Sequence, residues 1–154
     1  MRADQDAATP RAQGNYRTAI VSGGYVLTAG VTPRRDGVLI ATGTIGAEID
    51  TETARDLVAL ATASAIMGAR TALADALPAN RLVRCVRTVV LLRATPDFTE
   101  HARVADAASA TLAAEFGADG LGARTAFGAA SLPGGAPCEV ELTFEHAPPP
   151  GTLP

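Results

Sequence analysis

The chain has 154 residues, 47% of them apolar, so it is long and apolar enough to form one compact domain with a buried core. Its net charge of −3 and its pI near 5.3 disfavour nucleic acid as a partner. All 13 basic residues are arginines, which excludes a lysine Schiff base or pyridoxal phosphate anchor, and the two histidines and two cysteines lack the spacing of a zinc site, a disulfide framework or a catalytic triad.

The two ends of the chain are predicted to be flexible. Residues 1–14 are mostly small, polar or charged, and residues 147–154 read APPPGTLP, a composition that does not support a packed core. Residues 15–146 are expected to form a single domain between them. The start of the chain lacks the apolar segment of a signal peptide, and no later stretch has 18 consecutive apolar residues. We therefore expect a cytoplasmic protein with no membrane partner.

A β-hairpin is predicted for residues 18–30, TAIVSGGYVLTAG. Two short β-rich runs flank Gly23 and Gly24, and a two-residue turn of this composition is expected to have positive φ at both central residues. An Asp-Gly pair at residues 36 and 37 predicts a second turn. The apolar run after this turn predicts a third short strand around residues 38–42.

Two helices are predicted further along the chain. From residue 51 to about residue 76 the apolar residues recur at helical spacing, with Glu52 in the first turn and Pro78 beyond the end. An alanine-rich segment from residue 101 onward has the same period and closes at Gly117.

The strands between and after the helices complete the predicted sheet. Residues 82–94, LVRCVRTVVLLRA, are rich in β-branched residues and predict a central strand, in which Arg81 and Arg87 would share one face and Arg84 the other. In the last strand, CEVELTFE, apolar residues alternate with polar ones, so one side is expected to face the core. The predicted order is β-β-β-α-β-α-β-β, an α+β fold with one mixed sheet and both helices on one face. The other face is either solvated or packed against other subunits.

Arg124 is the candidate binding residue that the sequence itself singles out. In GARTAFGAAS it shares a strand face with Ala126, Gly128 and Ala130, which suggests space beside the guanidinium. A guanidinium in such a place is suited to bind a small carboxylate through two parallel hydrogen bonds. Glu139, on the next strand, is a candidate neighbour across the sheet. The alternative is that Arg124 and Glu139 only pair with each other on a solvated face.

Three stretches carry a family resemblance: TAGVTP after the hairpin, DFTEHARVADAAS at the second helix, and ARTAFGAASLPGGAPCEVEL near the end. The last stretch combines an arginine, an LP pair and an E-x-E strand. Together they resemble the reactive-intermediate deaminase family (RidA/YjgF) over residues 14–146. The resemblance implies a chorismate-mutase-like fold and a homotrimer with ligand pockets between subunits, which would cover the second face of the sheet.

The resemblance also implies roles for individual residues. Arg124 matches the family's carboxylate-binding arginine, Glu139 its water-handling glutamate, and Tyr16 a tyrosine near the pocket. Phe127 is expected either to line the pocket or to lie in the subunit interface. The chain departs from the family's frequent polar residues at three positions, Ala29, Ala102 and Ala126. Of these, Ala29 and Ala126 are counted with the substrate-binding residues.

The expected function is hydrolysis of reactive 2-imino or 2-enamino acids to 2-keto acids and ammonia, with no metal or other cofactor. Arg124 would bind the carboxylate, and Glu139 would position and deprotonate a water, with partial desolvation raising its pKa. Two alternatives follow from the three alanines. The chain could be a ligand-binding or regulatory trimer without turnover, or a hydrolase redirected to a larger metabolite.

Overall fold

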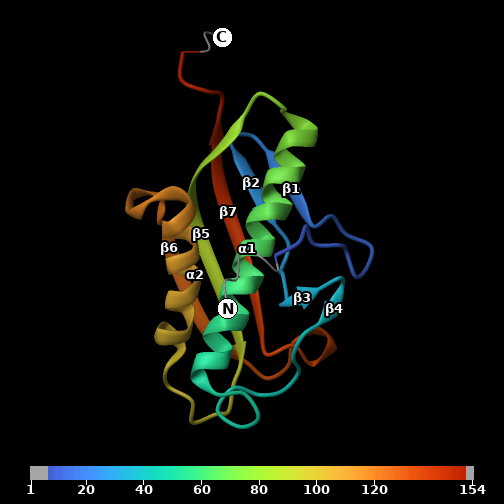
Figure 1. Cartoon of the computed structure of the whole chain (residues 1–154), viewed down its shortest axis with the longest axis vertical. Helices are drawn as coiled ribbons and strands as arrows, with labels where there is room; N and C mark the ends of the chain where they lie inside the picture. The colour runs from blue at the N-terminus through green and yellow to red at the C-terminus, as the bar shows by residue number, and fades with distance from the viewer. Residues whose placement is uncertain (1–6, 152–154) are drawn as a thin grey trace.

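The computed structural model describes residues 7–151, so the predicted flexible ends lie partly outside the described residues. A five-stranded sheet packs against two long helices that lie on the same face (Figure 1). Its strands are β1 (Ala19–Ser22), β2 (Tyr25–Thr28), β5 (Arg81–Arg93), β6 (Ala123–Ala129) and β7 (Cys138–Ala147), in the order β1-β2-β7-β5-β6. Strands β5 and β6 are parallel and the other neighbours are antiparallel. This arrangement confirms the predicted α+β fold with a mixed sheet.

The first hairpin forms as predicted, but the third strand does not join the main sheet. Only Gly23 of the glycine pair has a positive φ, 56°, so the turn needs one left-handed residue where two were expected. After β2, the two-residue strands β3 (Arg34–Arg35) and β4 (Val38–Leu39) pair only with each other. Their turn has positive φ at both Asp36 and Gly37, 52° and 82°. This strong local turn closes a separate small hairpin.

The two helices begin and end where the sequence predicts. Helix α1 (Thr51–Ala76) is capped by the Asp50 carboxylate, which accepts a hydrogen bond of 2.7 Å from the Thr53 N–H. Hydrogen bonding to Thr53 lowers the pKa of Asp50. Helix α2 (His101–Phe116) ends at Gly117, whose φ is 75°. Helix α1 is long and apolar enough to span a bilayer by composition, but 67% of its most apolar window is buried inside this fold. It is therefore placed as a core helix.

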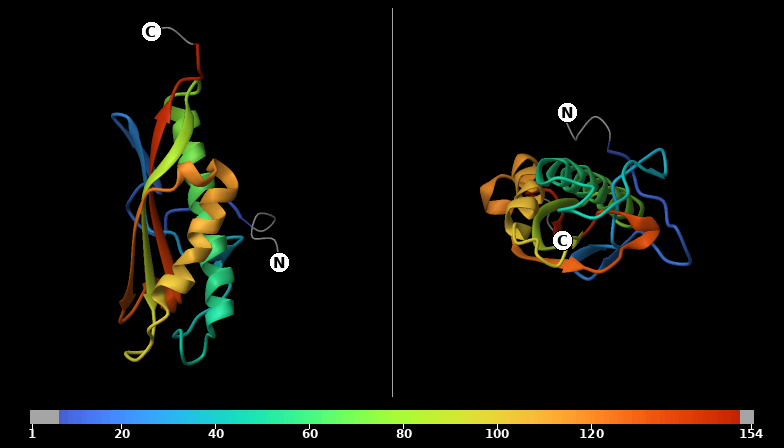
Figure 2. Two further views of the ribbon diagram at one scale, coloured as in Figure 1. Left: turned by 90° about the vertical axis from the view of Figure 1, so that its left-hand side faces the viewer. Right: turned by 90° about the horizontal axis from the view of Figure 1, so that it is seen from below.

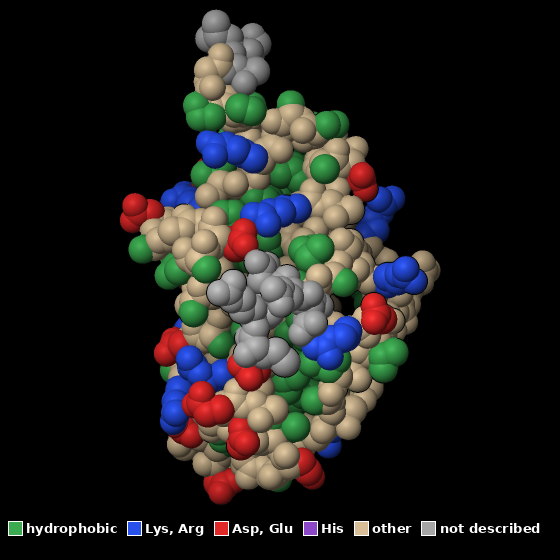
Figure 3. Space-filling model, in the orientation of Figure 1, with side chains coloured by type: hydrophobic (Ala, Val, Ile, Leu, Met, Phe, Trp, Pro, Cys, Tyr) green, Lys and Arg blue, Asp and Glu red, His purple; other side chains and the backbone are tan. Residues whose placement is uncertain are grey.

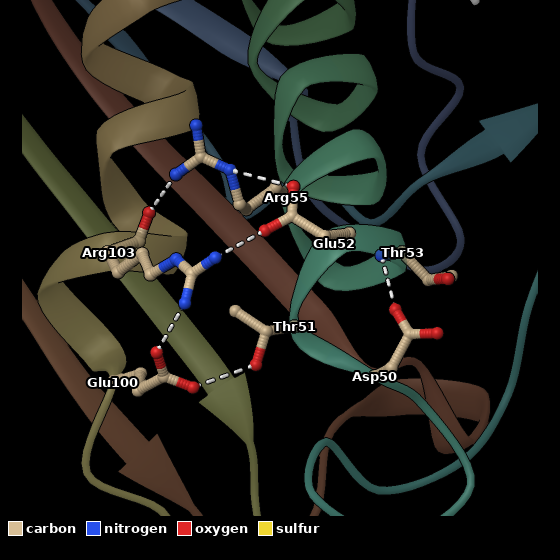
Figure 4. Close-up of polar contacts among 7 residues, drawn as sticks. All are labelled: Asp50, Thr51, Glu52, Thr53, Arg55, Glu100 and Arg103. Atoms are coloured by element: carbon tan, nitrogen blue, oxygen red, sulfur yellow. Dashed lines mark hydrogen bonds and ion pairs between the residues drawn. The ribbon is translucent and has the colours of Figure 1, made fainter.

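The first turns of the two helices are joined by a network of charged side chains (Figure 4). Arg103 of α2 donates hydrogen bonds to Glu52 of α1 at 2.8 Å and to Glu100 at 2.7 Å. Thr51 donates to the other oxygen of Glu100 at 3.0 Å, and the bonds from Arg103 and Thr51 lower the pKa of Glu100. Exposed pairs of this kind stabilise a fold only slightly. Their effect here is to fix how the starts of α1 and α2 lie against each other.

Strand β7 alternates as predicted, whereas β5 does not. The apolar residues of β7 point into the core and are at most 1% exposed: Cys138, Val140, Leu142 and Phe144. In β5 the register shifts between Leu82 and Arg84 and again between Cys85 and Arg87. The shifts are β-bulges, and they bring Arg84 and Arg87 onto the same face, opposite the prediction.

The face of the sheet away from the helices, here called the open face, is covered by no other part of the described chain (Figure 2). Four large apolar side chains on it are between 38% and 49% exposed: Ile20, Tyr25, Leu27 and Phe127. Leu91 and Val89 of β5 are half-buried among them. Acidic and basic side chains lie interspersed over the helix-covered side (Figure 3), and the open face carries charges too, among them the Arg84–Glu145 ion pair. An exposed apolar face on a sheet is typical of a surface that binds another protein subunit.

Candidate functional site

Arg124 lies in the edge strand β6 and points towards helix α2. Its Nη1 atom donates hydrogen bonds to Asp106 Oδ1 and to Ser109 Oγ, both at 2.8 Å. Its Nη2 atom makes a longer contact of 3.5 Å with the Ala102 carbonyl oxygen. The side chain of Arg124 is 24% exposed and that of Asp106 is 61% exposed. The ion pair therefore lies partly exposed at the rim of the contact between α2 and β6.

Arg124 and Glu139 lie on opposite faces of the sheet, which corrects their expected contact across it. Residues that pair directly on neighbouring strands point to the same face. Arg124 pairs with Thr88, which is 3% exposed and faces the helices. Glu139 pairs with Leu91 on the open face. The partner of Arg124 within the chain is therefore Asp106.

Glu139 lies against Gly30, just beyond the end of β2. A Cβ atom at position 30 would lie 1.7 Å from Glu139 Oε1, so only glycine leaves room for this carboxylate. Burial raises the pKa of Glu139 above its ordinary value, and the nearby charge of Glu141 raises it further. The direction is the one expected for a carboxylate that acts as a general base near neutral pH.

Replacing Glu139 with glutamine should stabilise the fold at neutral pH. A carboxyl group with a raised pKa binds its proton more tightly in the folded than in the unfolded chain. The stability of the wild type should therefore fall as the pH rises from the ordinary pKa of 4.5 through the folded value, and stay lower above it. Glu139→Gln has no carboxyl group to titrate and so does not lose stability in this way. Its free energy of unfolding should exceed that of the wild type at pH 7, on the order of 0.5 kcal/mol, and should equal it near pH 4.

Calorimetric melting of both proteins across this pH range measures the effect. The control Glu141→Gln should give a smaller change in the same direction, because Glu141 contributes only the lesser, charge–charge part of the raised pKa. A difference between Glu139→Gln and the wild type that is the same at every pH would contradict the assignment.

Tyr16 and Ala29 line a cavity of about 260 Å³ between the N-terminal segment and the connection from β2 to β3. The Tyr16 hydroxyl accepts a hydrogen bond of 3.2 Å from the Gln13 N–H. Gly30 also lines this cavity and is in contact with Glu139. The structure thus brings Tyr16 and Ala29 together at the cavity, and Glu139 lies next to it, against Gly30, without lining it.

The predicted site residues form two groups. We call Tyr16, Ala29, Gly30 and Glu139 the glutamate half-site, and Ala102, Asp106, Ser109 and Arg124 the arginine half-site. Strands β7 and β5 lie between β2 and β6, which places the edge strand about 14 Å from the end of the hairpin that carries Ala29. Glu139 itself lies on β7, two strands or about 10 Å from β6, and on the opposite face of the sheet. One small ligand cannot contact both half-sites of the same chain in this conformation.

The small residues that follow Arg124 on its face make room for helix α2. A Cβ atom at Gly128 would lie 3.2 Å from His101 Nε2, and Ala126 is partly buried against the core. The predicted space beside the guanidinium is therefore filled by the helix. Phe127 points to the open face, where it is 44% exposed. A role of Ala126 or Phe127 in binding stays a prediction.

Three residues of the half-sites were not identified from the sequence as functional. Asp106 and Ser109 follow Ala102 at positions i+4 and i+7 of α2, so the three share the helix face that meets Arg124. The helical spacing of these three residues can be read from the sequence. The sequence does not show which strand their helix face packs against. Gly30 stands in the quoted TAG stretch, and its contact with Glu139 involves a residue 109 positions away along the chain, which local pattern does not predict.

No family model matches this chain. Protein TCP17 of Trypanosoma cruzi is 31% identical over 132 residues, which cover 85% of this chain and 81% of TCP17. A solved structure from Shewanella oneidensis MR-1, named as a candidate endoribonuclease, is 27% identical with a TM-score of 0.80 and covers 91% of both chains. The YjgF structure from E. coli shares the fold at 22% identity and a TM-score of 0.57, with 91% of this chain and 96% of YjgF covered. With its LP and E-x-E motifs following Arg124, its mixed sheet and these similarities, the chain belongs to the RidA/YjgF family.

Proposed function

We propose that the protein is a cofactor-free hydrolase of reactive 2-imino and 2-enamino acids, with sites formed between the subunits of a homotrimer. The observation that carries this proposal is the separation of the two half-sites. The arginine half-site lies at the β6 edge on the helix-covered face, whereas Glu139 lies on the central strand β7 on the open face, next to Gly30 at the end of the hairpin. A ligand contacts both if the β6 edge of one subunit lies against the glutamate half-site of its neighbour.

The open face supplies the surface for this assembly. Its exposed apolar side chains lie on both sides of the sheet, from Ile20 in β1 to Phe127 in β6, while the central strand β7 presents polar and acidic residues between them. Burying them against neighbouring copies removes apolar area from water. The same assembly covers the edge strand β6, whose unpaired backbone N–H and C=O groups could otherwise form a β-sheet with other chains. In a closed ring every subunit makes the same two contacts with its neighbours, so no copy of the interface is left exposed.

The proposed reaction needs one bound water. Arg124 binds the ligand's carboxylate and so places the iminium carbon beside the water that the neighbour's Glu139 holds. Glu139 takes a proton from the water as its oxygen bonds to carbon and the C=N π electrons move to nitrogen. Glu139 returns this proton to the carbinolamine nitrogen, which becomes an ammonium group. The C–N bond then breaks with its electron pair going to nitrogen, while Glu139 takes the hydroxyl proton and passes it to the departing ammonia. The iminium and one water yield the 2-keto acid and ammonium, so atoms and charge balance.

Mixing two inactive variants tests whether the half-sites come from different subunits. Arg124→Ala and Glu139→Gln should each lose hydrolysis of freshly generated 2-iminopropionate, measured as release of pyruvate. After subunit exchange in an equal mixture, about a quarter of the interfaces should join an intact arginine to an intact glutamate and recover activity.

The double variant, carrying both substitutions in one chain, is the matched control, and its mixture with either single variant should stay inactive. No recovery in the mixture of single variants, with exchange verified by mass, would contradict the split site. A wild-type protein without activity on any 2-imino acid would contradict the proposed reaction itself.

One relative supports a small ligand of this type. E. coli TdcF, which has the same fold at 20% identity and a TM-score of 0.60, has been solved with bound serine. The binding-only alternative remains a second proposal, motivated by the alanines at positions 29, 102 and 126. Tight binding of a keto acid in calorimetry without turnover would favour it. The third proposal, a larger substrate, has less support at Arg124, because Ala126 is already partly buried against the core.

A further inference from the structure

Arg124 already has a carboxylate partner within its own chain, and this partner decides which ligands it can accept. Asp106 and Ser109 occupy the hydrogens of Nη1, each at 2.8 Å. Among the described residues, the remaining side of the guanidinium, formed by Nε and Nη2, has only the 3.5 Å contact to the Ala102 carbonyl. A ligand carboxylate can bind this side through two hydrogen bonds without displacing Asp106.

Asp106 changes the charge that such a ligand meets. The Arg124–Asp106 pair is neutral overall, so a ligand whose only charge is a carboxylate gains little long-range attraction and is repelled by the aspartate. The other charged groups near the start of α2 do not alter this balance. Arg103 is paired with Glu100 and Glu52, and the acidic Glu115 at the far end of the helix is paired with Arg70.

We propose that Asp106 is a specificity residue that recognises a cationic nitrogen on the carbon next to the ligand's carboxylate. This inference rests on the proposed function only for Arg124 as the carboxylate site. A 2-iminio acid or an α-amino acid carries both charges on adjacent carbons. Its carboxylate binds Arg124 while its nitrogen donates to Asp106, whose side chain is 61% exposed and open to the ligand. Each charge of the ligand then lies next to an opposite charge of the protein, the carboxylate next to Arg124 and the nitrogen next to Asp106.

This arrangement also distinguishes substrate from product. Hydrolysis replaces the cationic nitrogen by a carbonyl oxygen, which cannot donate to Asp106 and faces its negative charge. The 2-keto acid should therefore bind more weakly than the iminium acid, and the product should leave readily. A site built from an arginine alone would hold both equally through the carboxylate.

The test compares L-alanine with pyruvate, which share a carbon skeleton and differ in the group on the second carbon. Titration calorimetry of the wild type should give about 10-fold tighter binding of L-alanine than of pyruvate. In Asp106→Asn, which keeps the shape and removes the charge, L-alanine binding should weaken about 10-fold and pyruvate binding should tighten. Asp56→Asn, an exposed acid on α1, is the matched control and should leave both affinities unchanged.

The outcomes separate this inference from the proposed reaction. If Asp106→Asn weakens both ligands equally, Asp106 only orients Arg124 and the inference is wrong. It is also wrong if the wild type prefers pyruvate or binds neither probe. If the wild type prefers L-alanine and the variant reverses the preference, but no imine is hydrolysed, the inference stands and the proposed reaction is wrong. Circular dichroism melting of Asp106→Asn checks that the exposed substitution leaves the fold intact.

Discussion

Arg124→Ala should reduce pyruvate release from freshly generated 2-iminopropionate about 100-fold in kcat/KM, because two charge-assisted hydrogen bonds to the ligand carboxylate are lost. The reduction should be seen in both kcat and KM, since the arginine binds the ligand and also places its reacting carbon. The fold should survive. Arg124 lies at the rim of the helix–strand contact, and its partners Asp106 and Ser109 remain accessible to water after the substitution.

Two further variants make this measurement specific. Arg124→Lys keeps the charge but cannot form two parallel hydrogen bonds, so its activity should lie between those of the wild type and Arg124→Ala. Arg103→Ala removes another arginine next to α2, one whose side chain is 57% exposed and paired with Glu52 and Glu100. Its activity should be close to that of the wild type. If Arg124→Ala retains activity within about twofold, Arg124 is not the carboxylate site.

Leu27→Glu should convert the protein to monomers and abolish hydrolysis. Leu27 lies on the open face of β2, the strand next to edge strand β1, between Ile20 and Thr143 on the neighbouring strands, and is 38% exposed in the single chain. A carboxylate buried in a subunit interface without a partner costs several kcal/mol, and every copy of the interface would carry one. Light scattering coupled to size exclusion should give about three times 15.6 kDa for the wild type and 15.6 kDa for the variant.

Val38→Glu is the control for this substitution. Val38 is 68% exposed in the small β3–β4 hairpin, which is separate from the main sheet. The same change of side chain there should leave both mass and activity unaltered. A wild-type protein that is monomeric and still hydrolyses imines would contradict the proposed intersubunit site. So would a Leu27→Glu monomer with full activity.

Much of the fold could be predicted because its signals are local. Glu52 in the first turn of α1 and Gly117 after the last turn of α2 predict these helix ends through interactions within a few residues of each. The alternation of β7 separates core from surface because successive side chains of a strand point to opposite sides. The closing residues carry the family motif, since an arginine, an LP pair and an E-x-E strand can be read directly from the chain.

Bulges and pairing partners could not be predicted in the same way. The two register shifts in β5 arise from its pairing with β7, a strand more than 40 residues further on, and they turn Arg84 and Arg87 to one face. Strand β4 pairs with β3 across the tight Asp36-Gly37 turn and lies in a separate two-stranded sheet. In each case the structure depends on which strands pair and in which register, and the residues within one strand do not specify this.

The sequence by itself determined that Arg124 belongs to a strand, that small residues share its face, and that Glu139 lies on a strand with a buried side. Only the tertiary structure decided which way Arg124 points. The two faces of an isolated strand are equivalent, and they become different when α2 crosses from β5 to the parallel strand β6 and covers one of them. That crossing brings Asp106 to Arg124, fills the space beside Ala126 and Gly128, and leaves Glu139 on the uncovered side.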